Sequence, residues 1–227
     1  MFEVERQDIQ IIRYFPLFFL SKTRSFRNKV SNTRNISVFD AGCGTNVDVP
    51  YFFSLLSEKS NLPNYHLYEV DKNIYWLNIL EKRIVEENIE RNFALTFVNA
   101  KFEKLFIKVD RIFGDPAEKR VIKNQKFEPH SIDLLFMYSN MLYWLDFFDS
   151  DSSKAIKNLI KLLKKDGLLI VVQREGQPLL DEDVFLDYSL DLVESFSINR
   201  HRNPFNIQMG ISKSSQDYHI YIFKFQS

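Results

Sequence analysis

The stretch Ile36-Ser37-Val38-Phe39-Asp40-Ala41-Gly42-Cys43-Gly44-Thr45-Asn46 decides the fold of this chain. Apolar and β-branched residues lead into an acid, and two glycines one residue apart follow it. The next residues, from Asp48 to about Ser60, form an amphipathic pattern with Pro50 near its start, where a missing N–H is harmless. The stretch predicts a buried strand over 36–39, a tight glycine turn, and a helix whose N-terminal N–H groups face a ligand.

The residues around the glycines indicate the charge of that ligand. A dinucleotide site requires the spacing Gly-x-Gly-x-x-Gly, but Val47 stands at the third glycine position. Asp40 would repel a phosphate and attract a cation. The motif from Asp40 to Thr45 resembles the first motif of class I S-adenosylmethionine-dependent methyltransferases, whose cofactor carries a sulfonium and an ammonium group. Asn46 replaces the third glycine of that family's common motif. A dinucleotide-dependent oxidoreductase remains a remote alternative.

Composition restricts the class of protein. The chain has 227 residues, of which 45% are hydrophobic, and this suits one domain with a full core. The single Cys43 excludes a disulfide framework and a Cys-based zinc site, and it favours a reducing, cytoplasmic compartment. Thirty basic and thirty acidic residues cancel, so net charge does not favour a nucleic-acid partner. We expect no membrane span and no metal cluster. Oligomeric state stays open.

The order of segments predicts an α/β fold. Residues 1–35 are interpreted as an N-terminal helical segment (1–20) followed by a basic polar connector (21–35), and residues 36–227 as the main domain. Strand and helix patterns alternate after residue 36, which is typical of a parallel sheet covered by helices. We expect seven strands in a mostly parallel sheet, an antiparallel last strand, and helices on both faces. The expected strands are 36–39, 65–70, 94–98, 132–138, 168–172, 196–199 and 219–225. The expected helices are 48–60, 73–90, one opening at 151, and 181–194, with a short helix and a long loop over 99–131.

Ligands of open α/β sheets bind at the carboxyl ends of the strands, and this rule selects candidate residues. Asp40, Gly42 and Gly44 follow the first strand. Asp71 ends the second strand. Its carboxylate could accept hydrogen bonds from ribose hydroxyls. The alternative is that Asp71 caps the helix that follows. Glu69 alternates in phase with Asp71 and is the second choice for the same role.

The methyltransferase resemblance extends from Ile36 to about Gln173 and implies further contacts. Cys43, Tyr138 and Ser139 would join the cofactor site. The family often has an acid for the adenine amino group after the third strand; this chain has none there, so that contact falls to Asn99 or to backbone. The segment 133–146 is similar to small-molecule enzymes of the histamine N-methyltransferase kind. The candidate catalytic residues are Tyr138, Asn140, Tyr143 and His201, with Trp144 as a wall of the substrate site.

The sequence therefore predicts methyl transfer from S-adenosylmethionine to a small-molecule amine, hydroxyl or carboxylate. Methylation of base amino groups in this fold uses an Asp/Asn-Pro-Pro-Tyr/Phe turn that the segment 138–141 lacks, and cytosine C5 methylation needs a nucleophilic Cys in another place. One alternative is a protein or RNA methyltransferase that docks through 22–34 and 101–130. Another is a catalytically silent methyltransferase-fold partner protein.

Overall fold

The computed structural model describes residues 15–57, 63–89, 93–113, 120–138, 150–174, 185, 188–198 and 218–226. The strands are β1 (Asn35–Ala41), β2 (Asn64–Asp71), β3 (Ala94–Asn99), β4 (Val109–Phe113), β5 (Arg120–Gln125), β6 (Ile132–Tyr138), β7 (Leu163–Arg174), β8 (Leu190–Ile198) and β9 (Tyr218–Phe225). The helices are α2 (Phe15–Leu20), α3 (Arg24–Ser31), α4 (Asp48–Ser57), α5 (Ile74–Glu86) and α7 (Ser150–Leu162), with the short 3-10 helix η1 (Phe102–Lys104).

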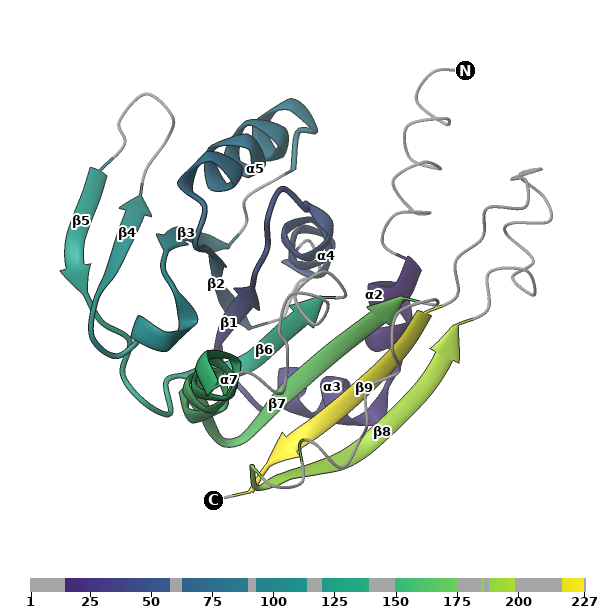
Figure 1. Ribbon diagram of the computed structural model, residues 1–227. Helices are drawn as coiled ribbons and strands as arrows, with labels where there is room; N and C mark the ends of the chain where they lie inside the picture. The colour runs from purple at the N-terminus through teal and green to yellow at the C-terminus, as the bar shows by residue number, and fades with distance from the viewer. Residues whose placement is uncertain are drawn as a thin grey trace, which may run out of the picture.

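All of these strands join one sheet in the order β5-β4-β3-β2-β1-β6-β7-β9-β8 (Figure 1). The ladders from β3 across to β7 are parallel, whereas β9 runs antiparallel to its neighbours β7 and β8. The antiparallel last strand is therefore confirmed. Strand β1 lies between β2 and β6, so the chain order reverses there. The carboxyl ends of these three strands border the crevice where such sheets bind ligands.

The prediction of seven strands was wrong, because the described residues form nine. The two additional strands, β4 and β5, make an antiparallel hairpin on the free edge of β3. They lie within the segment 99–131, for which the sequence predicted a short helix, which is present as η1, and a long loop, part of which these strands replace. Both strands are short, and charged residues interrupt or flank the apolar residues of each, so neither has the continuous apolar pattern by which the other strands were recognised.

A second difference concerns the segment 181–194, which was predicted to be a helix. Residues 190–194 belong to β8, which pairs with β9 along its whole length. Exposed and less exposed residues alternate along β8, which is the period of a strand. Residues 181–184, 186 and 187 lie outside the described part of the chain, and Phe185 is helical. Pairing with β9 therefore decides the conformation of a stretch whose local pattern was ambiguous.

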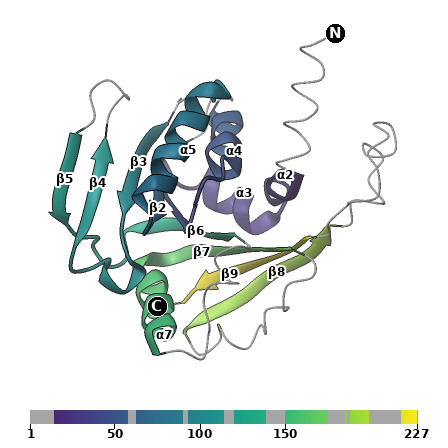
Figure 2. The same ribbon diagram turned by 45° about the horizontal axis from the view of Figure 1, so that its top comes forward.

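Helices cover both faces of the sheet, as predicted, and Figure 2 shows α7 on the face opposite α2, α3, α4 and α5. Alternation along β1 sorts the core: Val38 faces α4, whereas Phe39 faces α7. Helix α5 adds a smaller apolar cluster around Cys43 and Phe97. The carboxyl ends of the central strands are thus held between two packed layers.

Residues 24–31 form helix α3 instead of the connector that the sequence predicted. Phe26 and Val30, four residues apart, are buried against the core, and this one-turn spacing stabilises the helix. On the same helix, Lys29 pairs with Asp133 of β6 at 3.0 Å. The basic character of this segment is therefore partly structural.

Candidate functional site

The glycine loop that follows β1, residues 42–46, is hydrogen-bonded to the end of β2. The N–H groups of Gly42 and Cys43 donate to the carbonyl oxygen of Val70 at 2.8 and 3.3 Å. Gly42 and Gly44 adopt φ values of 68° and 57°, the left-handed region in which a side chain is strained. The glycines are therefore required by the turn, and the backbone of the loop stays free of Cβ atoms on the side where a ligand would approach.

Asp71, the last residue of β2, connects this loop to α5. Its Oδ2 accepts from the N–H of Gly44 at 3.1 Å, and its Oδ1 accepts from the N–H of Asn73 at 2.7 Å. Burial raises the pKa of Asp71, and these two hydrogen bonds oppose the increase. Asn73, and not Asp71, caps α5, since its side chain accepts from the N–H of Tyr75. Two backbone donors thus fix the orientation of the Asp71 carboxylate.

Asp40 and Glu69 form a buried acid pair below the loop. They are partners in the β1–β2 register, and both side chains are shielded from solvent. Oδ1 of Asp40 and both carboxyl oxygens of Glu69 find no hydrogen-bond partner among the described residues. Burial raises the pKa of Asp40 to about 7 and that of Glu69 well above its ordinary value, with the Asp40 charge adding to the second effect. Burial therefore favours the protonated form of both carboxyl groups, and a bound cation would favour the ionised form.

The start of α4 closes the loop on its other side. The N–H of Asp48 donates to the side-chain oxygen of Asn46 at 3.1 Å. Asn46 is not among the residues with positive φ, so it replaces the family's third glycine as a hydrogen-bond acceptor, without a left-handed backbone. Arg83 of α5 donates to the carbonyl oxygen of Thr45 at 2.6 Å. The loop is therefore held by β2, α4 and α5 together.

Asn99 is the last residue of β3 and Tyr138 is the last residue of β6, the strands on either side of the β2–β1 pair. The side-chain nitrogen of Asn99 donates to the carbonyl oxygens of Asp71 and Lys72, at 3.2 and 2.9 Å, so it ties β3 to the end of β2. The hydroxyl of Tyr138 is buried, and burial, with Asp48 next in effect, raises its pKa well above the ordinary value. Tyr138 is therefore a neutral donor at physiological pH and not a base.

The structure brings most of the predicted cofactor residues to one edge of the sheet: Asp40, Gly42, Cys43, Gly44, Asp71, Asn99 and Tyr138. Ser139, Asn140, Tyr143, Trp144 and His201 lie outside the described residues. Among the described residues, no group of His, Cys, Asp and Glu is arranged to hold a metal ion, and no helix combines the length and the hydrophobicity needed to cross a membrane.

Two features of the site were undervalued or missed in the sequence. Glu69 was only a second choice for the ribose, but its register with Asp40 makes it half of the buried pair. Three consecutive apolar residues, Ile74, Tyr75 and Trp76, are all exposed at the first turn of α5. A Cβ placed on Gly44 would lie 3.9 Å from the Trp76 ring, so this ring borders the loop. The signal for this lay in three consecutive apolar residues, of which a helix can bury only part.

Comparison with known proteins assigns the fold. No protein-family model matches the chain, and no curated protein sequence matches it. Among solved structures, the cyclase SpnF matches with a TM-score of 0.51 at 11% identity, over 88% of this chain and 77% of that one. A protein from Thermoplasma acidophilum assigned as a methyltransferase matches with a TM-score of 0.51 at 11% identity, over 85% and 69% of the two chains.

A third structure, from Galdieria sulphuraria and assigned as a sarcosine dimethylglycine methyltransferase, has a TM-score of 0.50 at 11% identity, over 88% and 82% of the two chains. The chain therefore has the fold of class I S-adenosylmethionine-dependent methyltransferases. At such identity the likeness shows the fold alone. Since one of these neighbours is named a cyclase, the reaction has to be argued from the site.

Proposed function

We propose that the protein binds S-adenosylmethionine at the glycine loop and transfers its methyl group to a small molecule. The observation that carries this proposal is the buried pair Asp40–Glu69 beside two left-handed glycines. No basic side chain of the described residues forms an ion pair with either carboxyl group. Ionising either carboxyl group in its buried position is costly, and a cationic ligand offsets that cost. The phosphates of a dinucleotide would increase it.

The residues present fit this cofactor. When bound, S-adenosylmethionine supplies an electrophilic methyl group next to a positive charge. Asp40 and Glu69 would stabilise its cationic end, and the bare backbone at Gly42 and Gly44 would allow it to lie close. Asp71 would accept hydrogen bonds from the ribose hydroxyls, because each of its oxygens has a lone pair that Gly44 and Asn73 do not use.

The adenine would lie between α5 and β3. Both donors of the Asn99 amide face backbone carbonyls, which leaves its oxygen to accept from the adenine amino group. The exposed ring of Trp76 at the glycine loop offers an aromatic face for the base. This assignment gives adenine a contact without the acid that the family often has after this strand.

The protein's own contribution to methyl transfer is mainly positioning. Tyr138 keeps its proton at neutral pH, so it can orient an acceptor as a donor but cannot deprotonate it. An amine that has already lost its proton in water needs only alignment, and alignment alone supplies a large rate increase. This favours a small amine, in keeping with the likeness of 133–146 to histamine N-methyltransferase-like enzymes. We keep Asn140, Tyr143 and His201 as further candidates for acceptor contact, and Ser139 for cofactor contact.

Calorimetric titration with S-adenosylmethionine, S-adenosylhomocysteine and NAD tests the cofactor. We expect micromolar binding of the first two and none of NAD. Asp71→Asn should weaken binding at least tenfold, because the amide loses the charge and its nitrogen can accept neither from the loop backbone nor from a ribose hydroxyl. The matched control is Glu86→Gln, an exposed acid on the same side of the sheet. Failure of both sulfur ligands to bind would overturn the enzyme assignment and leave a partner protein with a borrowed fold.

If the cofactor binds, release of S-adenosylhomocysteine from panels of amines, hydroxyls and carboxylates identifies the acceptor class. Turnover on an RNA or protein substrate, with none on any small molecule, would favour the macromolecular alternative. The β4–β5 hairpin is the observation that favours this second function, because it extends the sheet beyond β3, the strand that ends at Asn99, and carries the exposed Lys123.

A further inference from the structure

Strand β5 ends the sheet, and the described residues place no strand on its outer side. Val121 is 52% exposed and Ile122 is 46% exposed. Consecutive strand residues point to opposite faces, so neither face of β5 is covered at this position. Nearby, in the turn that follows η1, Ile107 is 69% exposed. An open strand edge flanked by apolar side chains is a template for pairing with another extended chain.

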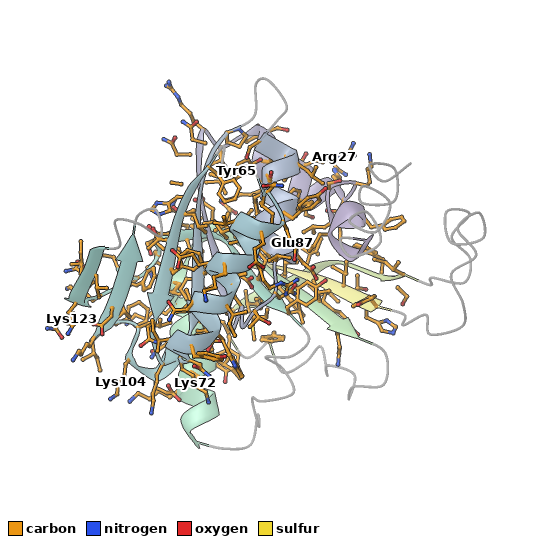
Figure 3. All side chains as sticks on the ribbon, turned by 90° about the horizontal axis from the view of Figure 1, so that it is seen from above. Arg27, Tyr65, Lys72, Glu87, Lys104 and Lys123 are labelled. Atoms are coloured by element: carbon orange, nitrogen blue, oxygen red, sulfur yellow. The ribbon has the colours of Figure 1, made fainter. Side chains whose placement is uncertain are left out.

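The surface around this edge is basic. Lys104, Lys108 and Lys123 are exposed and form no ion pair with any described residue, and Figure 3 shows Lys104 and Lys123 on the hairpin side of the molecule. Lys126 reaches Glu128 at 3.4 Å in an exposed pair. In the whole segment 101–126 the sequence has eight basic and four acidic residues. The local charge therefore differs from the neutral balance of the chain.

The lysine on β5 discriminates among possible occupants of the edge. Two copies of the chain that paired β5 with β5 would bring like charges together around Lys123, which disfavours self-association. A nucleic acid would match the charge but needs exposed rings for stacking. Around the hairpin, Phe127 is buried and Phe106 lies under Lys161 at 5.3 Å, so neither of these two rings is open for stacking. An acidic extended peptide meets neither obstacle.

We propose that β5 is a docking edge for an extended acidic segment of a partner protein, which adds to the sheet as a further strand. Backbone hydrogen bonds along residues 120–123, before Asn124 enters the left-handed region with a φ of 57°, supply affinity, and alternate side chains supply specificity. Val121 and Ile122 contact apolar side chains of the segment, and Lys123 contacts its acids. This interaction goes beyond the cofactor site and does not depend on it.

Selection of random eight-residue peptides displayed on phage against the full-length protein tests the proposal. We expect enriched peptides to combine Asp or Glu with β-branched residues and to exclude proline at the centre. Synthetic copies of them should protect the amides of residues 120–125 from hydrogen exchange. Lys123→Glu should weaken their binding about tenfold, and added salt should weaken it further. Lys157→Glu, on exposed α7, is the matched control and should change nothing.

Three results would overturn the proposal. The first is enrichment of no peptide, or of peptides that bind Lys123→Glu and the unaltered protein equally. The second is binding of polyuridylate RNA that depends on Lys123 while acidic peptides fail to bind. The third is a dimer in solution whose formation protects residues 120–125, which would assign this edge to a second copy of the chain.

Discussion

Asp40 lies opposite Glu69 in the β1–β2 ladder, and its pKa of about 7 falls within the range in which enzymes work. Below that pH the pair holds a proton that must leave when a cation binds. We therefore expect the affinity for S-adenosylmethionine to rise between about pH 6 and pH 8, by up to tenfold for each pH unit below the pKa. Calorimetry across this range measures the effect. Asp40→Asn should abolish the pH dependence, and a pH-independent affinity in the unaltered protein would contradict the role of the pair.

The raised pKa of Glu69 leads to a prediction about how the stability of the fold depends on pH. Its pKa in the folded protein lies well above the ordinary value of 4.5, because it is buried. The folded state then binds more protons than the unfolded state above that value, so stability should fall as pH rises above 4.5. Glu69→Gln should reduce this slope, leaving the part that Asp40 contributes below its pKa of about 7, and should raise stability at pH 8. Urea midpoints at each pH measure it, and Glu86→Gln should leave the slope unchanged.

At the scale of elements, Asp133 joins three segments at the amino end of β6. It pairs with Lys29 of α3 at 3.0 Å and with Lys164 of β7 at 2.7 Å, and it accepts from the N–H of Ser37 in β1 at 3.0 Å. Burial alone would raise its pKa, but these donors hold the pKa below the ordinary value. Its contribution to stability is therefore present above the pKa of the unfolded chain and lost in acid.

Asp133→Ala should lower the free energy of unfolding by about 2 kcal/mol, since it leaves two lysines and a backbone N–H without their acceptor. The loss should shrink as pH falls through the acid range. Chemical denaturation at pH 7 and pH 3 measures both values. Glu128→Gln breaks only an exposed pair and should change stability by less than about 0.5 kcal/mol. Equal effects of the two substitutions would show that Asp133 does not hold these elements together.

For the whole molecule, a ligand that binds only the folded state should stabilise it by mass action. S-adenosylmethionine at about 100 times its Kd adds about 2.7 kcal/mol, which for a chain of this size raises Tm by about 5–10 °C. A thermal unfolding scan measures the shift. NAD at the same concentration should leave Tm unchanged. A Tm shift with NAD and none with S-adenosylmethionine would show that the glycine loop binds a dinucleotide.

Much of the site could be predicted from local sequence. The strand β1, the glycine turn and Asp71 appear where the pattern placed them, because burial, backbone freedom and strand ends are properties of a few neighbouring residues. Helix α3 and strand β8 were misread for the opposite reason. Each is stabilised by contacts with distant segments, α3 through Phe26 and Lys29, and β8 through its ladder with β9.

The sequence by itself determined that this is an α/β protein whose glycine loop follows a buried strand and an acid. Periodicity and the conformational limits of glycine act locally, so no tertiary information was needed. Only the tertiary structure decided that Glu69 lies against Asp40, and that β4 and β5 extend the sheet beyond β3. Both depend on which strands become neighbours and in what register, and that is set when the whole sheet assembles.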